Sequence, residues 1–197
     1  FNFMKDRFEL REALSVEYKE DLRSKSDAQI AEAVICREVY KITKQWPKRP
    51  DIPEGFSFQY NIPSYLVFQT PVLQKALQQI RETKFIIEDD RITGLKEILI
   101  QINKSTYGVG IGGLHSKEKN VSYKSNEATS IIDRDVASYY PRIIINGKLF
   151  PEHIGEAFLE VYSSLTERRL LAKKNKNTAT DKGLKVTING TGGKFND

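Results

Sequence analysis

The chain has 197 residues, of which 31 are Lys or Arg and 26 are Asp or Glu, so its formal net charge is +5. This length suits one large domain or part of a larger protein. No apolar run is long enough for a membrane span and no signal-peptide pattern opens the chain, which predicts a soluble protein without a membrane partner. One cysteine and two histidines exclude an internal disulfide and argue against a metal site built on Cys or His. Any metal chemistry would therefore depend on carboxylates.

The positive charge is concentrated at the C-terminal end. Residues 161–197 contain eight Lys or Arg against three acidic residues, which accounts for the whole net charge. A localised basic segment predicts an anionic partner, most often phosphate. Because the chain starts at Phe1 rather than Met and stops after a glycine-rich stretch, we also expect it to be a piece of a longer protein.

The predicted elements follow the order helices, sheet, helical hairpin. A helix is expected over 27–43, capped by Ser26 or Asp27, and a proline-rich linker follows over 46–53. The other expected elements are a helix at 71–83, strands at 85–87, 98–102, 107–114, 121–123 and 130–136, a hairpin turn at 88–90, and helices at 151–174 and 181–189. Glycines after Asn189 are expected to end the last helix. This order predicts an α+β fold.

Two acidic residues follow the apolar pair Ile131-Ile132 in the predicted strand 130–136. Asp133 and Asp135 are two residues apart, so both carboxylates would lie on one face of a strand. With no Cys or His nearby, such a pair suits a hard cation such as Mg²⁺. The alternative, solvated charges at a strand end, needs no ligand and is the simpler interpretation of this segment alone.

The predicted helix 151–174 changes character along its length. An apolar stripe runs from Ile154 to Leu165 at helical spacing, and the next positions of the same stripe are Arg168 and Arg169. The commoner explanation of such a basic run is that the helix leaves the core and its face becomes solvated.

A second i, i+4 pair favours a binding role for these cations. Arg169 and Lys173 project side by side on one helix, and Lys185 and Asn189 repeat the spacing on the next. In an antiparallel hairpin the two pairs can converge on one polyanion. A triphosphate would fit, and so would a nucleic-acid backbone.

The glycine run imitates a dinucleotide-binding fingerprint. It reads Gly108-Val-Gly110-Ile-Gly112-Gly113, with Asp133 further along the chain. That fingerprint must open a helix, and the polar residues after Leu114 show no helical periodicity, so we reject a Rossmann fold here. The glycines instead allow close approach of the backbone to a ligand, and His115 is equally suited to a structural hydrogen bond or a functional role.

These segments, in this order, resemble motifs of family B DNA polymerases, in particular those of bacteriophage type. The first polymerase motif, usually D-x-x-S-L-Y-P-S-I-I, resembles Asp135-Val-Ala-Ser138-Tyr139-Tyr140-Pro141-Arg142-Ile143-Ile144. The fingers motif, K-x-x-x-N-S-x-Y-G, resembles Lys185-Val-Thr-Ile-Asn189-Gly190-Thr-Gly192-Gly193, preceded by Arg169-x-x-x-Lys173. The glycine-rich segment between the exonuclease and polymerase domains is similar to Gly110-Ile-Gly-Gly-Leu-His115.

The resemblance implies template-directed DNA synthesis, that is, deoxynucleotidyl transfer to a primer 3′-hydroxyl. Two Mg²⁺ ions would be held by Asp135 and the carbonyl of Val136. Backbone amides of Ser138 and Tyr139 would contact the triphosphate, and Tyr140 would exclude a 2′-hydroxyl. The remaining nucleotide-binding residues would be Arg169, Lys173, Lys185 and Asn189. The implied DNA-binding residues are Gly110, Gly112, Gly113, His115, Gly193 and Lys194.

The resemblance also implies an organisation. Residues 1–106 would be a helical linker region, 107–150 an N-terminal palm segment with part of the palm sheet, and 151–197 the fingers helices. Partners would be primer-template DNA, deoxynucleoside triphosphates and the remaining polymerase fragment. The expected location is cytoplasmic, in the host cell if the protein is phage-encoded.

This chain departs from the family pattern at several points. Arg142 and Gly190 stand where the motifs have Ser, and Gly192 stands where the fingers motif has Tyr. No D-T-D motif follows, so the second metal-binding carboxylate would come from outside this chain, and the chain alone is expected to be inactive. Two alternatives stay open: a non-catalytic nucleic-acid- or partner-binding remnant of the fold, and a primase-polymerase or other nucleotidyltransferase with a similar palm.

Overall fold

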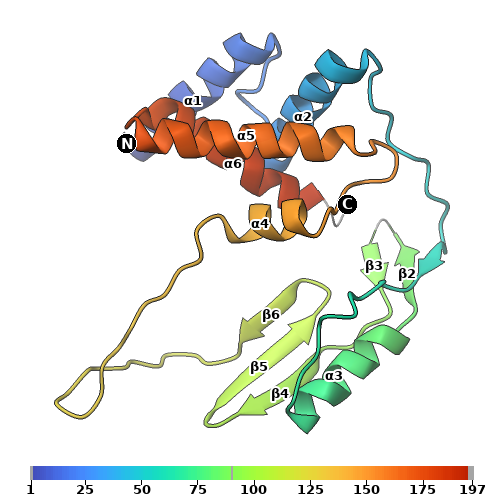
Figure 1. The fold of residues 1–197 in the computed structure, drawn as a ribbon, viewed down its shortest axis with the longest axis vertical. Helices are drawn as coiled ribbons and strands as arrows, with labels where there is room; N and C mark the ends of the chain where they lie inside the picture. The colour runs from blue at the N-terminus through green and yellow to red at the C-terminus, as the bar shows by residue number, and fades with distance from the viewer. Residues whose placement is uncertain (1, 90, 195–197) are drawn as a thin grey trace. The chain divides into compact units, whose positions relative to one another are not determined.

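The structure, a computed structural model, describes residues 2–89 and 91–194 and divides into two compact units (Figure 1). One unit is helical and combines Phe1–Pro50 with Asp135–Asp197. The other, Asp51–Arg134, carries the strands of the described residues. The expected mixed α+β class is confirmed. The units cut across the expected division at 106 and 150, because the first two helices pack with the last ones rather than with the strands.

The helical unit contains α1 (Asn2–Tyr18), α2 (Asp27–Thr43), α4 (Tyr139–Asn146), α5 (Ala157–Lys174) and α6 (Thr178–Lys194). Helix α2 forms as predicted, and its start is a capping box: Gln29 N–H donates to the Ser26 hydroxyl at 3.3 Å while the Gln29 side chain accepts from the Ser26 N–H at 2.9 Å. Its apolar face is buried. Helix α1 was not expected from the sequence.

The core of the helical unit is apolar and shared by all five helices. The buried members include Leu14, Tyr18, Ile30, Val34, Ile144, Phe158, Tyr162, Leu165, Leu184 and Ile188. The Tyr162 hydroxyl donates to the Ile188 carbonyl at 3.2 Å and so ties α5 to α6. Figure 1 shows these two helices, orange and red, crossing below α1 and α2. Burial of this shared core is the main stabilising contribution to the unit.

Helix α6 differs from its prediction. It was expected to end at Asn189, yet it continues through Gly190 and Gly192 to Lys194. Glycine costs about 1 kcal/mol relative to Ala inside a helix. The structure offsets that cost by packing α6 against α2 and α5. Helix α4 was also expected to be only a turn, whereas Pro141 and Ile144 bury one face of it.

The second unit contains two antiparallel three-stranded sheets. One sheet has the order β1-β2-β3, formed by Ser57–Phe58, Phe85–Glu88 and Arg91–Thr93. The other has the order β4-β5-β6, formed by Ile98–Ile102, Ser105–Gly110 and Gly113–Ser116. Helix α3 (Pro71–Glu82) precedes β2 and contacts β4. Glu88 pairs with Arg91, which confirms the predicted hairpin turn; its residue Asp90 lies outside the described residues.

Three strand predictions are corrected. The run 107–114 is not one strand but parts of β5 and β6, joined by a turn at Ile111-Gly112. The runs 121–123 and 130–136 form no strand. A strand needs a hydrogen-bonding neighbour, and no described strand pairs with either run. Consequently Ile131 and Ile132 are 62% and 66% exposed, and Asp135 lies in a segment without regular secondary structure rather than on a sheet.

Candidate functional site

Two residues of α6 that resemble the fingers motif line a basic pocket in the helical unit. The pocket has a volume of about 370 Å³, and Lys185 and Asn189 form part of its wall. Lys182, three residues before Lys185, belongs to the same face of the helix. Lys185 and Asn189, which the sequence places at i and i+4, therefore line the same pocket.

Helix α1 supplies the opposite wall. Arg7 and Arg11 are one turn apart on α1 and both line the pocket, together with Leu10. Among the described residues of the lining, Asp27, at the start of α2, is the one acidic residue. The described lining thus contains four basic side chains and one carboxylate, a balance that favours an anion.

Arg11 makes two polar contacts inside the helical unit. Its Nη2 lies 2.6 Å from the Asp27 Oδ1, and its Nε donates to the Lys25 carbonyl at 3.3 Å. The Arg11 side chain is 13% exposed. Asp27 therefore neutralises Arg11 within the wall of the pocket.

The two cations on α5 that resemble those of the preceding fingers helix, Arg169 and Lys173, lie outside this pocket. The Arg169 Nε pairs with Asp181 Oδ1 at 3.1 Å, and the two side chains are 16% and 24% exposed. Asp181 is one turn before Lys185, so this pair aligns α5 with the basic row of α6. Neither Arg169 nor Lys173 lines the pocket, and Lys173 is exposed near the end of α5.

The residues that resemble the first polymerase motif begin in an exposed segment before α4, in the same unit, and continue into α4, where Pro141 and Ile144 are buried. Asp135 is exposed, and Val136 is 58% exposed. Ser138 is the N-cap of α4 with φ 56°, a left-handed conformation that is rare for a non-glycine residue. Tyr139 and Tyr140 are 53% and 69% exposed, with ring centroids 5.5 Å apart. Their rings are therefore available to a ligand.

A magnesium site can be tested against these donors. Mg²⁺ in nucleotide enzymes is bound by one or two carboxylates, with phosphates and waters completing its shell. In the described part of the chain no three His, Cys, Asp or Glu side chains gather into a group able to hold a metal. Asp135 and the Val136 carbonyl fit as one edge of such a site, and the residues described here do not complete a two-metal site.

The glycine-rich residues implied to bind DNA form a hairpin in the second unit. Gly110 pairs with Gly113 across the turn, and Gly113 has φ 108°, which only glycine adopts readily. A side chain at Gly112 would meet nothing within 4 Å, so the turn leaves its backbone open. His115 is exposed and its Nε2 lies 3.2 Å from the Gly112 carbonyl. The glycine run leads into strand β6 and not into a helix, which confirms that it is not a dinucleotide-binding fingerprint.

The last implied DNA-binding residues end α6. Gly193 and Lys194 are helical, and their side-chain positions lie outside the described residues. The pocket residues that sequence reasoning missed are Arg7, Arg11 and Lys182. The i, i+4 spacing of Arg7 and Arg11 beside Leu10 and Leu14 was the available signal.

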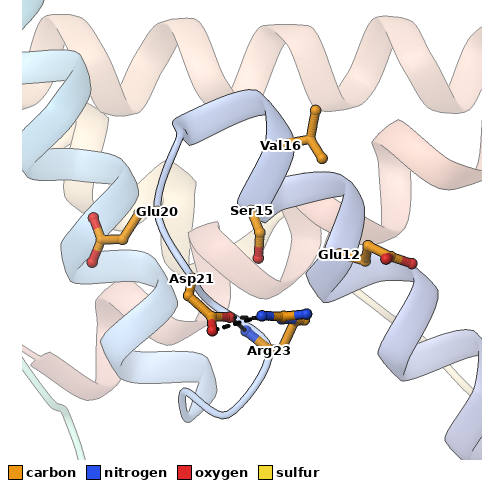
Figure 2. A pocket seen from close by; sticks show the side chains of 6 residues that line it. All are labelled: Glu12, Ser15, Val16, Glu20, Asp21 and Arg23. Carbon is orange, nitrogen blue, oxygen red and sulfur yellow. Dashed lines mark hydrogen bonds and ion pairs between the residues drawn. The ribbon is translucent and has the colours of Figure 1, made fainter.

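A second hollow, of about 260 Å³, lies between α1 and the loop before α2 (Figure 2). Its described lining contains the acidic residues Glu12, Glu20 and Asp21 and one cation, Arg23, which donates two hydrogen bonds of 2.9 Å to Asp21. Those bonds lower the pKa of Asp21 to about 2. The excess of carboxylates makes this hollow unsuitable for phosphate.

No described helix combines the length and apolar character needed to cross a membrane. Comparison with protein-family models, with characterised proteins and with solved structures found no match. The likeness to family B DNA polymerases therefore rests on the motif residues of the chain itself.

Proposed function

We propose that this chain is part of a family B DNA polymerase that extends a primer by template-directed transfer of deoxynucleotides. The observation that carries the proposal is the position of Lys185 and Asn189. These two residues of the fingers motif line one basic pocket with cations from α1. A pocket with four cations and one carboxylate suits the triphosphate of an incoming nucleotide.

The residues of the pocket would act by charge and hydrogen bonding. The Lys185 ammonium would bind phosphate oxygens, and the Asn189 amide would add a directional hydrogen bond. Arg169 and Lys173, on the neighbouring helix α5, would extend the basic surface toward the same phosphates. Exchange of Asp181 for a phosphate oxygen would release Arg169 for this role.

The exposed segment before α4 would contribute the remaining groups. Asp135 and the Val136 carbonyl would hold Mg²⁺, which when bound supplies charge neutralisation for phosphoryl transfer. Tyr140, with its ring 69% exposed, would pack under the sugar. A second carboxylate would come from a further segment of the polymerase, so synthesis is expected only from the assembled enzyme.

The nucleotide pocket can be tested on the chain alone by titration calorimetry with dATP and Mg²⁺. A charged hydrogen bond contributes about 1.5–3 kcal/mol, so Lys185→Gln should raise Kd about 10- to 150-fold. Lys176→Gln is the matched control, because Lys176 is exposed in the loop before α6 and lines no described pocket. Equal Kd values for the two variants would remove the pocket from the proposal.

A non-catalytic nucleic-acid- or partner-binding role is the second candidate. It is favoured by the pairing of Arg11 with Asp27 and of Arg169 with Asp181, which neutralises two cations. This role predicts DNA binding that weakens steeply with salt, without specific binding of dATP. Salt titration of DNA binding beside the calorimetric experiment separates the two roles.

A further inference from the structure

The end of helix α2 carries a group of aromatic and basic side chains, here called the Trp46 patch, which are exposed except for the half-buried Arg37. It consists of Arg37, Tyr40, Lys44, Trp46, Lys48 and Arg49. The first three recur at i, i+3 and i+7, so they share one face of α2. Lys44 ends the helix in a left-handed conformation with φ 59°, and two residues later the Trp46 ring returns over that face.

The rings of the patch are held in place but remain exposed. The Tyr40 and Trp46 centroids are 5.7 Å apart with planes at 53°, and the Arg37 guanidinium lies 5.6 Å from the indole centroid. Even so, Tyr40 is 43% exposed and Trp46 is 49% exposed. Val39, beside Tyr40 in the sequence, is 3% exposed and faces the core. The rings therefore do not complete the core of the helical unit.

The patch is also the most basic stretch of the N-terminal half of the helical unit. Residues 37–50 contain five Lys or Arg and one acid, Glu38. Glu38 is already paired with Lys41 at 2.7 Å, and Lys41 and Lys44 lie where the helix C-terminus carries partial negative charge. Lys48 and Arg49 lie on the exposed chain after the helix, so their positive charge is not needed to balance the helix C-terminus.

We propose that the Trp46 patch binds single-stranded nucleic acid. Exposed aromatic rings bordered by cations are the combination that single strands require, because unpaired bases stack on rings while phosphates meet the cations. A duplex offers no free base faces, so it can use only the cations of the patch. The patch shares no residue with the basic pocket of α6, and the proposal does not depend on the proposed polymerase function.

The chain reports on this surface directly, because Trp46 is its single tryptophan. Titration with an oligo(dT) strand should quench the Trp46 fluorescence, since a stacked base contacts the indole. A Tyr40→Ala variant should raise Kd about 5- to 150-fold, the effect expected for loss of one stacked base. Tyr65→Ala is the matched control, because Tyr65 is 77% exposed in the second unit. Circular dichroism verifies that the variants stay folded.

The cations are tested by salt dependence. Each phosphate contact on a single strand contributes about −0.7 to the slope of log K against log salt, so Lys48→Gln with Arg49→Gln should reduce the slope by about 1.4. Lys119→Gln with Lys124→Gln, both exposed in the second unit, should leave it unchanged. Binding without quenching, or equal binding of a duplex of the same length, would overturn the proposal. Lys185→Gln should not affect the quenching, which separates this test from that of the pocket.

Discussion

Gly190 of α6 lies directly against the main chain of Asp27 at the start of α2. A Cβ built on Gly190 would contact the Asp27 carbonyl oxygen and would lie 2.8 Å from the carbonyl carbon and 3.0 Å from the Ala31 Cβ. Only a residue without a side chain permits this approach. It gives a physical reason for Gly at the position where the resembled fingers motif has Ser. By contrast, a Cβ on Gly192 would meet nothing within 4 Å.

The two glycines should therefore respond in opposite directions to substitution. Gly190→Ala should lower the free energy of unfolding by about 1–3 kcal/mol, because the added methyl forces α6 away from α2. Gly192→Ala should raise it by roughly 0.5–1 kcal/mol, because the helix gains propensity without a clash. Urea denaturation measures both. Stabilisation by both substitutions would show that α6 does not approach α2 this closely.

The ion pair between Arg169 and Asp181 yields a prediction with two readouts. Asp181→Asn removes the carboxylate that competes with phosphate for Arg169, so affinity for dATP should increase. The same substitution should lower stability by about 0.5–1.5 kcal/mol, since the pair is largely buried and Arg169 loses its partner. Calorimetric titration and thermal unfolding measure the two effects. Asp51→Asn is the control, because it removes an exposed carboxylate in the linker after α2.

Alkaline pH should destabilise the helical unit through Tyr162. Burial raises the pKa of Tyr162 from 10.0 to about 12. Because the unfolded chain ionises first, stability present below pH 10 is lost as the pH rises toward 12. Tyr162→Phe should reduce that loss, leaving the part due to Tyr18, whose pKa is also raised by burial. At neutral pH the variant should lose about 0.5–1.5 kcal/mol with the hydrogen bond to Ile188.

Asp135 should matter for synthesis and not for folding. It is exposed, so Asp135→Ala should change stability by no more than about 0.5 kcal/mol. In the assembly with a polymerase fragment that carries the second acidic motif, the substitution should abolish Mg²⁺-dependent primer extension. Asp133→Ala is the matched control, because it removes an exposed carboxylate two residues away. Full activity of the Asp135→Ala assembly would refute the polymerase assignment.

Local signals were sufficient for several elements. Ser26 and Gln29 form the capping box of α2, and the helix spans Asp27–Thr43 as its apolar spacing predicts. The run Ile98–Ile102 is a strand with the predicted bounds. In each case residues that are neighbours in the chain determine where the element begins and ends, through helix capping, turn residues and the spacing of apolar side chains. The basic excess of residues 161–197 is likewise a property of the sequence alone.

The sequence predicted only part of the candidate site. The spacing of Lys185 and Asn189 placed them on one helix face, and both line the basic pocket. That Arg7 and Arg11 form the opposite wall depends on the packing of α1 against α6, between residues far apart in the chain. The pairing of Arg169 with Asp181 is similarly a contact between two helices. The spacing of charged residues along one helix does not predict which of them will pair with a residue of another helix.

The sequence by itself determined the α+β class, the bounds of α2 and β4, and the location of the positive charge, because these follow from local period, capping and composition. Tertiary structure alone decided that α6 continues past its glycines and that 130–136 forms no strand. Gly190 remains helical because α2 packs closely against it. Ile131 and Ile132, despite their strand propensity, pair with none of the strands that the structure describes.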